Sequence, residues 1–260
     1  MKDTPAIQRP FTTEDLRPLL AEADVDATVL VQTWSSIAET WDFLELAGKT
    51  DFIAGVVGWV DLSYPFIDSI LAELLASPHG HYLVGIRHQV HDEPDPNWLL
   101  RPDVQHGLQA VQNAGLVYDL LTRTRELPAC LETVCQFPQL RFVIDHIAKP
   151  PIASGATEDW FAKLEPFGQL ENVWCKLSGM VTEADWDLWT PADLAPYVNR
   201  VIEIFGEDRL IFGSDWPVCL SAATYEEVKN ALEDALGDTH DTAWAKIFGA
   251  NAIDVYRLDL

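Results

Sequence analysis

One pattern recurs along the whole chain: a short apolar run rich in Val, Ile and Leu, then a polar loop, then a stretch with helical periodicity. Runs that are apolar at nearly every position are typical of strands buried on both faces, and strands that alternate with helices pair in parallel. The seven apolar runs cover residues 27–34, 53–62, 83–90, 116–121, 141–147, 173–179 and 209–216. The helical stretches between them cover residues 36–48, 65–77, 102–114, 126–137, 190–205 and 224–236. The pattern predicts an α/β fold.

Polar side chains gather at the carboxyl ends of most of these runs. They are Gln32, Asp61, Arg87 with His88, Asp119, Asp145 with His146, Lys176 and Asp215. An open doubly wound sheet usually binds its ligand at one switch point, whereas a (β/α)8 barrel collects residues from every strand end around one axis. The distribution therefore favours a TIM-type barrel, which we expect residues 1–260 to form as a single domain.

One barrel strand is missing from this scheme. A helical pattern at residues 12–23 precedes the first apolar run, with Thr12 or Thr13 as N-cap and Asp15 in the first turn. A strand should come before that helix, but residues 1–11 contain no apolar run that could form one. The sequence thus predicts a barrel without its first strand.

Composition excludes several partners. Against 17 Lys and Arg stand 41 Asp and Glu, a formal charge of -24, so clustered cations for nucleic acid or an anionic membrane are not expected. No apolar segment approaches the roughly 20 residues of a membrane span, and no secretory signal opens the chain. The 4 cysteines show no CxxC spacing. We expect a soluble, cytoplasmic protein with reduced thiols.

Asp215 ends the apolar run in "RLIFGSDWPV". At a barrel mouth the last side chain of a strand enters the site, and a carboxylate there can accept a proton from water or bind a metal that activates water. The alternatives are a helix N-cap or a salt-bridge partner for an arginine.

"FVIDHIAKP" repeats this arrangement with Asp145 and His146. A neutral imidazole can hydrogen-bond a carbonyl, transfer a proton or ligate a metal. Because successive strand residues point to opposite faces, only one of the two should enter the barrel mouth. We favour His146, with Asp145 in a structural role; a hydrogen-bonded core histidine is the alternative.

Three more polar residues are candidates. Arg87 and His88 end a strand before a loop crowded with acids and prolines, and a guanidinium there can clamp a carboxylate or polarise a carbonyl. Lys176 could hold a substrate oxygen, or it could neutralise Asp145 or Asp215. The loop after Arg87 could equally be a solvated charged segment.

Tryptophans beside polar strand ends commonly stack on the apolar faces of sugar rings. Candidates of this kind are Trp34, Trp98, Trp186 and Trp216, although any one of them could instead be a core residue. No GxSxG elbow, P-loop or GxGxxG after a strand is present, so hydrolysis through an activated water is the chemistry these residues favour.

These residues lie in segments that resemble one family, the amidohydrolase-related sugar lactonases, which include L-fuconolactonase and L-rhamnonolactonase. The segments are "GVVGWVDL", "GIRHQVHDEPDPNWLLRPDV", "GLVYDLL", "FVIDHIAKP", "CKLSGMVTEADW" and "FGSDWPVC". Their order is specific for the family and much less specific for the substrate. The resemblance implies a metal-dependent barrel hydrolase of carbohydrate catabolism that opens the cyclic ester of a sugar acid.

Carried over by residue, the resemblance makes Asp215 the general base for the attacking water. His146, with His88 and Arg87, would polarise the lactone carbonyl or stabilise the tetrahedral oxyanion. Lys176 and the four tryptophans would contact hydroxyls and ring faces of the substrate.

The sequence departs from the family at its start, where an Asp-x-His-x-His motif is expected on the first strand. No His occurs before His79, and Asp119 stands where related barrels have a further His. At most one divalent metal, zinc, is expected, with His146 and Asp215 as its only inherited ligands. Either the chain begins downstream of the motif, or the strand has been lost.

Other functions stay open. A catalytically inactive barrel that binds sugar acids would explain the missing strand, and amide hydrolysis or decarboxylation would suit the same fold. An open barrel edge would also favour a homo-oligomer.

Overall fold

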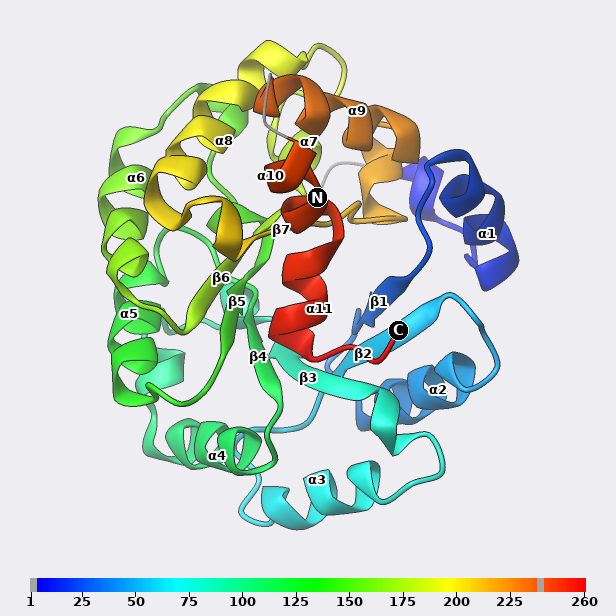
Figure 1. Cartoon of the computed structure of the whole chain (residues 1–260). Helices are drawn as coiled ribbons and strands as arrows, with labels where there is room; N and C mark the ends of the chain where they lie inside the picture. Colours follow the sequence, from blue (N-terminus) through cyan, green and yellow to red (C-terminus); the bar gives the residue numbers. More distant parts are fainter. Residues whose placement is uncertain (1–3, 238–240) are drawn as a thin grey trace.

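Seven parallel strands form one sheet in chain order in the computed structural model, which describes residues 4–237 and 241–260 (Figure 1). The strands are β1 (Thr28–Val31), β2 (Ile53–Gly58), β3 (Leu83–His88), β4 (Val117–Leu120), β5 (Phe142–Ile144), β6 (Val173–Leu177) and β7 (Leu210–Phe212). Each strand pairs with the next, and the sheet curls with most of the helices around its outer face. The predicted barrel-type α/β fold is confirmed.

Helices lie at all the positions that the periodicity indicates. These helices are α1 (Thr13–Glu22), α2 (Ile37–Ala47), α3 (Ile67–Leu75), α4 (Pro102–Asn113), α5 (Leu127–Gln136), α8 (Pro191–Phe205) and α9 (Tyr225–Leu236). The structure adds four helices that the sequence analysis did not predict: α6 (Glu158–Leu164), α7 (Met180–Glu183), α10 (Asp241–Ala245) and α11 (Asn251–Tyr256). Thr12 is the N-cap of α1, and its backbone N–H donates to Asp15 Oδ2 at 2.9 Å. The expected cap and first-turn acid are both present.

The sheet is open between its first and last strands. Residues 4–12 contain a short 3₁₀ turn at Pro5–Ile7 and no strand, and within the described residues β1 and β7 are not paired with each other. All four residues of β1 are only half-buried, as expected for an edge strand. The described part of the chain therefore has one strand fewer than a closed (β/α)8 barrel, as the sequence predicts.

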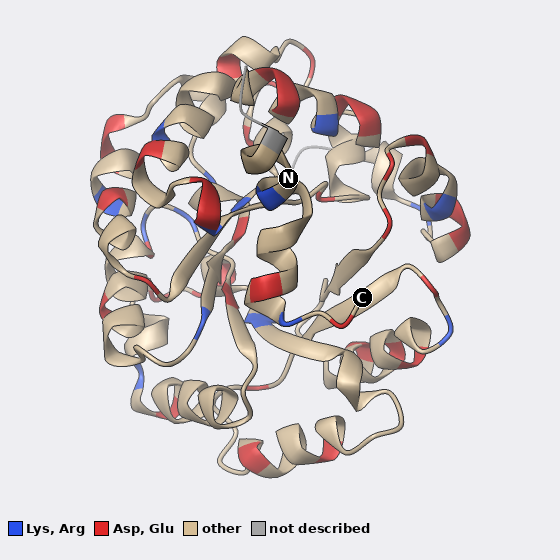
Figure 2. Ribbon diagram, in the orientation of Figure 1, with Lys and Arg blue, Asp and Glu red and all other residues tan. Residues whose placement is uncertain are grey.

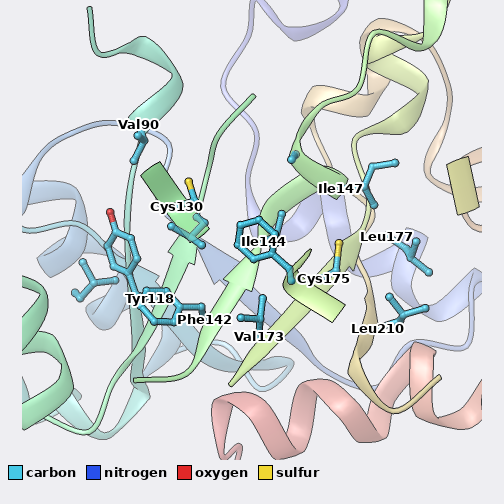
Figure 3. Close-up of a cluster of buried hydrophobic side chains, with 14 of the residues drawn as sticks. Val90, Tyr118, Cys130, Phe142, Ile144, Ile147, Val173, Cys175, Leu177 and Leu210 are labelled. Atoms are coloured by element: carbon cyan, nitrogen blue, oxygen red, sulfur yellow. The ribbon is translucent and has the colours of Figure 1, made fainter. Parts of the chain in front are cut away.

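Alternation along the strands separates two layers of side chains. One set packs outward against the helices and is fully buried, and it includes Tyr118, Phe142, Ile144 and Cys175 (Figure 3). The other set points inward and forms a second apolar cluster of Val57, Val117, Val143, Trp174 and Ile211. Helix α11 lies inside the curl of the sheet (Figure 1) and adds its side chains to this inner cluster.

The inner face changes character toward the carboxyl ends of the strands. Asp119 follows Val117 by two positions in β4, and Lys176 follows Trp174 by two positions in β6. Because residues two apart point to the same face, these polar side chains form a layer directly above the apolar one. The curled sheet thus presents a buried polar layer at the end where barrel enzymes place their sites.

The surface and the thiols agree with the composition. Asp and Glu appear on many of the outer helices (Figure 2). The 4 cysteines are free: Cys130, Cys175 and Cys219 are buried, and Cys135 is exposed. Across the described part of the chain, we find no helix with both the length and the apolar character needed to cross a membrane.

Candidate active site

A network of four charged side chains occupies the polar layer. Lys176 Nζ lies 3.0 Å from Asp119 Oδ2 and 2.5 Å from Asp145 Oδ1. Arg87 Nη1 donates to Asp145 Oδ2 at 2.8 Å, and Arg87 Nη2 donates to the carbonyl of Gln32. Both carboxylates are fully buried, so the cations on β3 and β6 are needed to offset the cost of removing them from water.

Burial and ion pairing oppose each other in this network. Burial raises the pKa of Asp119 to about 6 despite the neighbouring Lys176. Burial also acts to raise the pKa of Asp145, but Lys176 and Arg87 outweigh it and hold that pKa below its usual range. Burial disfavours the charged Lys176, but the two carboxylates raise its pKa well above the ordinary value. Lys176 is therefore a buried ammonium that binds Asp145, one of the two partners its position suggested.

The chain turns sharply after β5. His146, Ile147, Ala148 and Lys149 have φ values of 52°, 47°, 59° and 48°, the left-handed region that non-glycine residues seldom occupy. Such strain is common where a fold fixes functional side chains. Strand alternation sends Asp145 inward, and the left-handed turn then returns His146 to the same region. The prediction that only one of these two residues would enter is wrong, because β5 ends at Ile144 and alternation does not extend to His146.

His146 is held from one side by the segment that follows β6. Its Nδ1 lies 2.7 Å from Ser178 Oγ, within hydrogen-bond distance. Gly179 has φ +62°, and a Cβ atom placed there would lie 2.7 Å from His146 Cγ and Nδ1. A side chain at position 179 would thus displace the imidazole. Burial lowers the pKa of His146 well below its ordinary value, so the ring is neutral.

Asp215 meets His146 across the layer. His146 Nε2 and Asp215 Oδ1 are 3.7 Å apart, and both side chains keep a small exposed fraction of 10% and 15%. Asp215 lies three residues beyond β7 with φ 55°. Burial raises its pKa to about 6, against the opposing charges of Lys149 and Arg87. A carboxylate with this pKa is ionised at neutral pH and basic enough to take a proton from water.

His88 has a different environment. Trp59 Nε1 donates to His88 Nδ1 at 3.0 Å, so the ring proton is on Nε2, which donates to Glu93 Oε1 at 2.8 Å. Trp98 stacks on the ring with centroids 4.2 Å apart and an interplanar angle of 10°. Both nitrogens and one face of His88 are therefore used within the protein. These contacts fasten the loop after β3 and favour that role for His88 over the expected contact with the substrate carbonyl.

The four tryptophans are dispersed. Trp34 is 74% exposed, whereas Trp98 is buried against His88. Trp186 Nε1 donates to the carbonyl of Thr182, and its side chain lines a surface cleft of about 440 Å³ on the α9 side. Trp216 makes an edge contact with Phe11, with ring centroids 5.2 Å apart.

Three features near the site are absent from the sequence expectations. Lys149 Nζ lies 3.3 Å from Glu183 Oε1, and Arg123 Nη1 lies 3.2 Å from the other oxygen of that carboxylate. Gly179 makes room for His146, and Tyr256 reaches Asp119 from α11. Lys149 lies within the quoted "FVIDHIAKP" and Gly179 within the quoted "CKLSGMVTEADW", so both could have been found there. No sequence pattern around Tyr256 identifies it.

The expected zinc ligands give an incomplete set. His146 Nε2 and Asp215 Oδ1 face each other and could each bind a metal ion. The other nitrogen of His146, Nδ1, is used by its contact with Ser178 and is not available as a ligand. Over residues 4–237 and 241–260, no group of three or more His, Cys, Asp or Glu side chains is placed to hold a metal ion. Catalytic zinc sites use three protein ligands, so the described residues do not by themselves fit a zinc ion.

Known proteins resemble this chain over 70% to 98% of its length. The L-fucono-1,5-lactonase of Burkholderia ambifaria is 39% identical over 264 residues, which cover 98% of this chain and 88% of that protein. The L-rhamnono-gamma-lactonase of Scheffersomyces stipitis is 28% identical over 207 residues, with 70% of this chain and 61% of that protein covered. A crystal structure of an amidohydrolase from Burkholderia multivorans with bound zinc has a TM-score of 0.91 at 35% identity, covering 96% of this chain and 90% of that one. The amidohydrolase family profile matches residues 1–258, and with this match the chain belongs to the amidohydrolase family.

Proposed function

We propose that this protein hydrolyses the lactone of a sugar acid, such as L-fuconolactone or L-rhamnonolactone, by an activated water molecule. Relatives named as lactonases of these two sugar acids support the substrate class. The observation that carries the proposal is the convergence of His146 Nε2 and Asp215 Oδ1, 3.7 Å apart at the carboxyl end of the sheet.

In the proposed reaction Asp215 takes a proton from water as the water oxygen attacks the lactone carbonyl carbon. With Ser178 Oγ–H donating to Nδ1, the neutral His146 carries its proton on Nε2 and donates to the carbonyl oxygen, which becomes the tetrahedral oxyanion. The ring C–O bond then breaks, and Asp215 returns its proton to the departing alkoxide. The product is the open hydroxy acid, and Asp215 is again a carboxylate.

The remaining candidates take supporting roles. Arg87 binds Asp145 through a hydrogen bond. Its positive charge also opposes the effect of burial on Asp215 and so keeps the pKa of that carboxyl from rising further. Lys149 is also positive, so it favours the ionised form of Asp215 in the same way. Trp34 is the candidate tryptophan that is most free to stack on a sugar ring, because the residue is 74% exposed. We keep Lys176, Trp98, Trp186 and Trp216 as proposed contacts of the substrate.

A divalent metal stays part of the proposal because a relative contains zinc. The described residues offer two of the ligands it would need, so we derive no step through the metal. Zinc held by two side chains should be lost easily. After gel filtration in zinc-free buffer, mass spectrometry should find well below one zinc per chain, and a tightly held stoichiometric zinc would contradict this expectation.

We further propose a single domain over residues 1–260, a cytoplasmic location and self-association at the open edge of β1. Sedimentation at several protein concentrations tests the last of these. A monomer at all concentrations would refute it.

The main experiment is a pH-monitored screen of sugar-acid lactones against wild-type protein and Asp215→Asn. This isosteric change removes the base, so kcat should fall by about a thousandfold or more while the fold is kept, as checked by thermal unfolding. A parallel panel of amides and carboxylic acids separates lactone hydrolysis from amide hydrolysis and decarboxylation. Saturable binding of sugar acids without turnover would favour the inactive binding protein instead.

A further inference from the structure

We infer that Tyr256 is a positioning residue of the site, acting from inside the sheet through Asp119 and Lys176. The kinetic part of this inference rests on the proposed lactone hydrolysis. The structural part can be tested without it.

Tyr256 belongs to the helix that fills the interior of the sheet. Helix α11 lies within the curl of the strands (Figure 1), and Val255 and Tyr256 pack with inward side chains such as Val117 and Trp174. Val255 is 0% exposed and Tyr256 3% exposed. The phenol ring thus belongs to the apolar layer, and its hydroxyl reaches the polar layer above.

The hydroxyl of Tyr256 has one charged partner. It donates to Asp119 Oδ2 at 2.8 Å, the same oxygen that lies 3.0 Å from Lys176 Nζ. Among the described residues the other oxygen, Asp119 Oδ1, is buried without a hydrogen-bond partner. Without the hydroxyl, Lys176 would be the one described partner left to this fully buried carboxylate. The position of the Lys176 ammonium between Asp119 and Asp145 should then change.

Lys176 connects this contact to the catalytic pair by two routes. Its Nζ holds Asp145 Oδ1 at 2.5 Å, and Asp145 directly precedes His146. Its aliphatic stem packs over Gly213, where an added Cβ would lie 3.2 Å from Lys176 Cδ, and Gly213 is two residues before Asp215. A shift of Lys176 would therefore move both the turn that carries His146 and the strand end that carries Asp215.

If Tyr256 served only to pack the interior, loss of its hydroxyl would have a different effect from the one we infer. The Lys176 ammonium lies 6.0 Å from the centre of the Tyr256 ring, and Tyr256→Phe keeps that ring and its apolar contacts. Val255→Ala removes buried apolar atoms from the same helix, and the Val255 side chain forms no hydrogen bond with Asp119 or Lys176. The backbone carbonyl of residue 255, which accepts from Arg141 Nη1 at 3.2 Å, is kept in this variant. The two variants thus separate the loss of the hydroxyl from the loss of packing.

The kinetic experiment compares wild type, Tyr256→Phe, Val255→Ala, Asp119→Asn and the double variant Asp119→Asn/Tyr256→Phe on the best lactone. We expect Tyr256→Phe to lower kcat about tenfold with KM within about twofold, because the reacting groups are displaced and the substrate contacts are not. Val255→Ala should lower the unfolding temperature and leave kcat within about twofold of wild type. The double variant Asp119→Asn/Tyr256→Phe should have a kcat within about twofold of that of Asp119→Asn alone.

The second experiment needs no activity. In protein labelled with ¹⁵N-lysine, the buried Lys176 ammonium should give a resolved signal, assigned by its loss in Lys176→Met. This signal should shift in Tyr256→Phe and stay in place in Val255→Ala.

An unchanged Lys176 signal in Tyr256→Phe would overturn the inference whether or not the protein hydrolyses lactones. Equal kcat losses in Tyr256→Phe and Val255→Ala, or multiplicative losses in the double variant, would also overturn it. A shifted signal in a protein without lactone turnover would support the link between Tyr256 and Lys176 and refute the proposed function alone.

Discussion

Two histidines, His88 at the end of β3 and His146 after β5, differ in how many of their ring nitrogens the protein uses. His88 at the end of β3 accepts from Trp59, donates to Glu93 and stacks on Trp98. His146 after β5 contacts Ser178 through Nδ1, while its Nε2 faces Asp215 at 3.7 Å, beyond direct hydrogen-bond distance. Both rings are nearly buried, so burial does not distinguish them.

The difference shows that two histidines at strand ends can have quite different contacts. A histidine whose nitrogens are both used within the protein stabilises a loop, because reaction would require breaking those bonds. A histidine with one nitrogen fixed and the other turned toward a carboxylate can donate to a substrate placed between them. The unused nitrogen is therefore the feature that separates His146 from His88.

His146→Gln should give the largest difference between the two sites. Glutamine keeps a polar group but lacks the imidazole, so kcat for lactone hydrolysis should fall about a hundredfold. Steady-state kinetics on the best substrate of the screen measures the change, and thermal unfolding controls for folding. Turnover within about threefold of wild type would remove His146 from the proposed mechanism.

The pH profile should follow the carboxylate that faces His146. Burial raises the pKa of Asp215 to about 6, and the ionised form is the base, so activity should be lost as pH falls through that value. We expect kcat/KM to drop about tenfold per pH unit below pH 6 and to be level above it, after subtraction of uncatalysed hydrolysis. A profile that is flat from pH 5 to 7 would contradict Asp215 as the general base.

Gly179→Ala tests whether the placement of His146 matters beyond its presence. The new Cβ would lie 2.7 Å from the imidazole at φ +62°, so the ring must move and kcat should fall about fivefold. Gly155→Ala is a matched control, since Gly155 has φ +68° and nothing within 4 Å of an added Cβ. The backbone cost is thus similar in both variants, and equal kcat values would argue against a placement effect.

His88→Gln should have the smallest effect on turnover. The substitution removes the stacked ring and alters the bonds to Trp59 and Glu93, so we expect a loss of about 1–2 kcal/mol in the free energy of unfolding. Because His88 is occupied by these contacts, kcat should stay within about threefold of wild type. A loss as large as that of His146→Gln would erase the distinction between the two histidines.

The sequence predicts the strands, their order and the open edge, because buried parallel strands leave continuous apolar runs. It also predicts that Asp215 and His146 lie at strand ends. It does not predict that Asp145 and His146 enter the same region, since the left-handed turn after β5 contains no glycine or asparagine to announce it. The link from Tyr256 to Asp119 joins residues far apart in the chain and depends on tertiary packing alone.

The left-handed turn at residues 146–149 limits how this protein can be made more heat-resistant. Each non-glycine residue held there costs about 1–2 kcal/mol, which the surrounding packing must offset. Ala148→Gly would relieve part of that cost, yet it would also increase the backbone freedom of the turn that carries His146. Substitutions intended to raise the thermal stability should therefore be made in the outer helices and not in this turn.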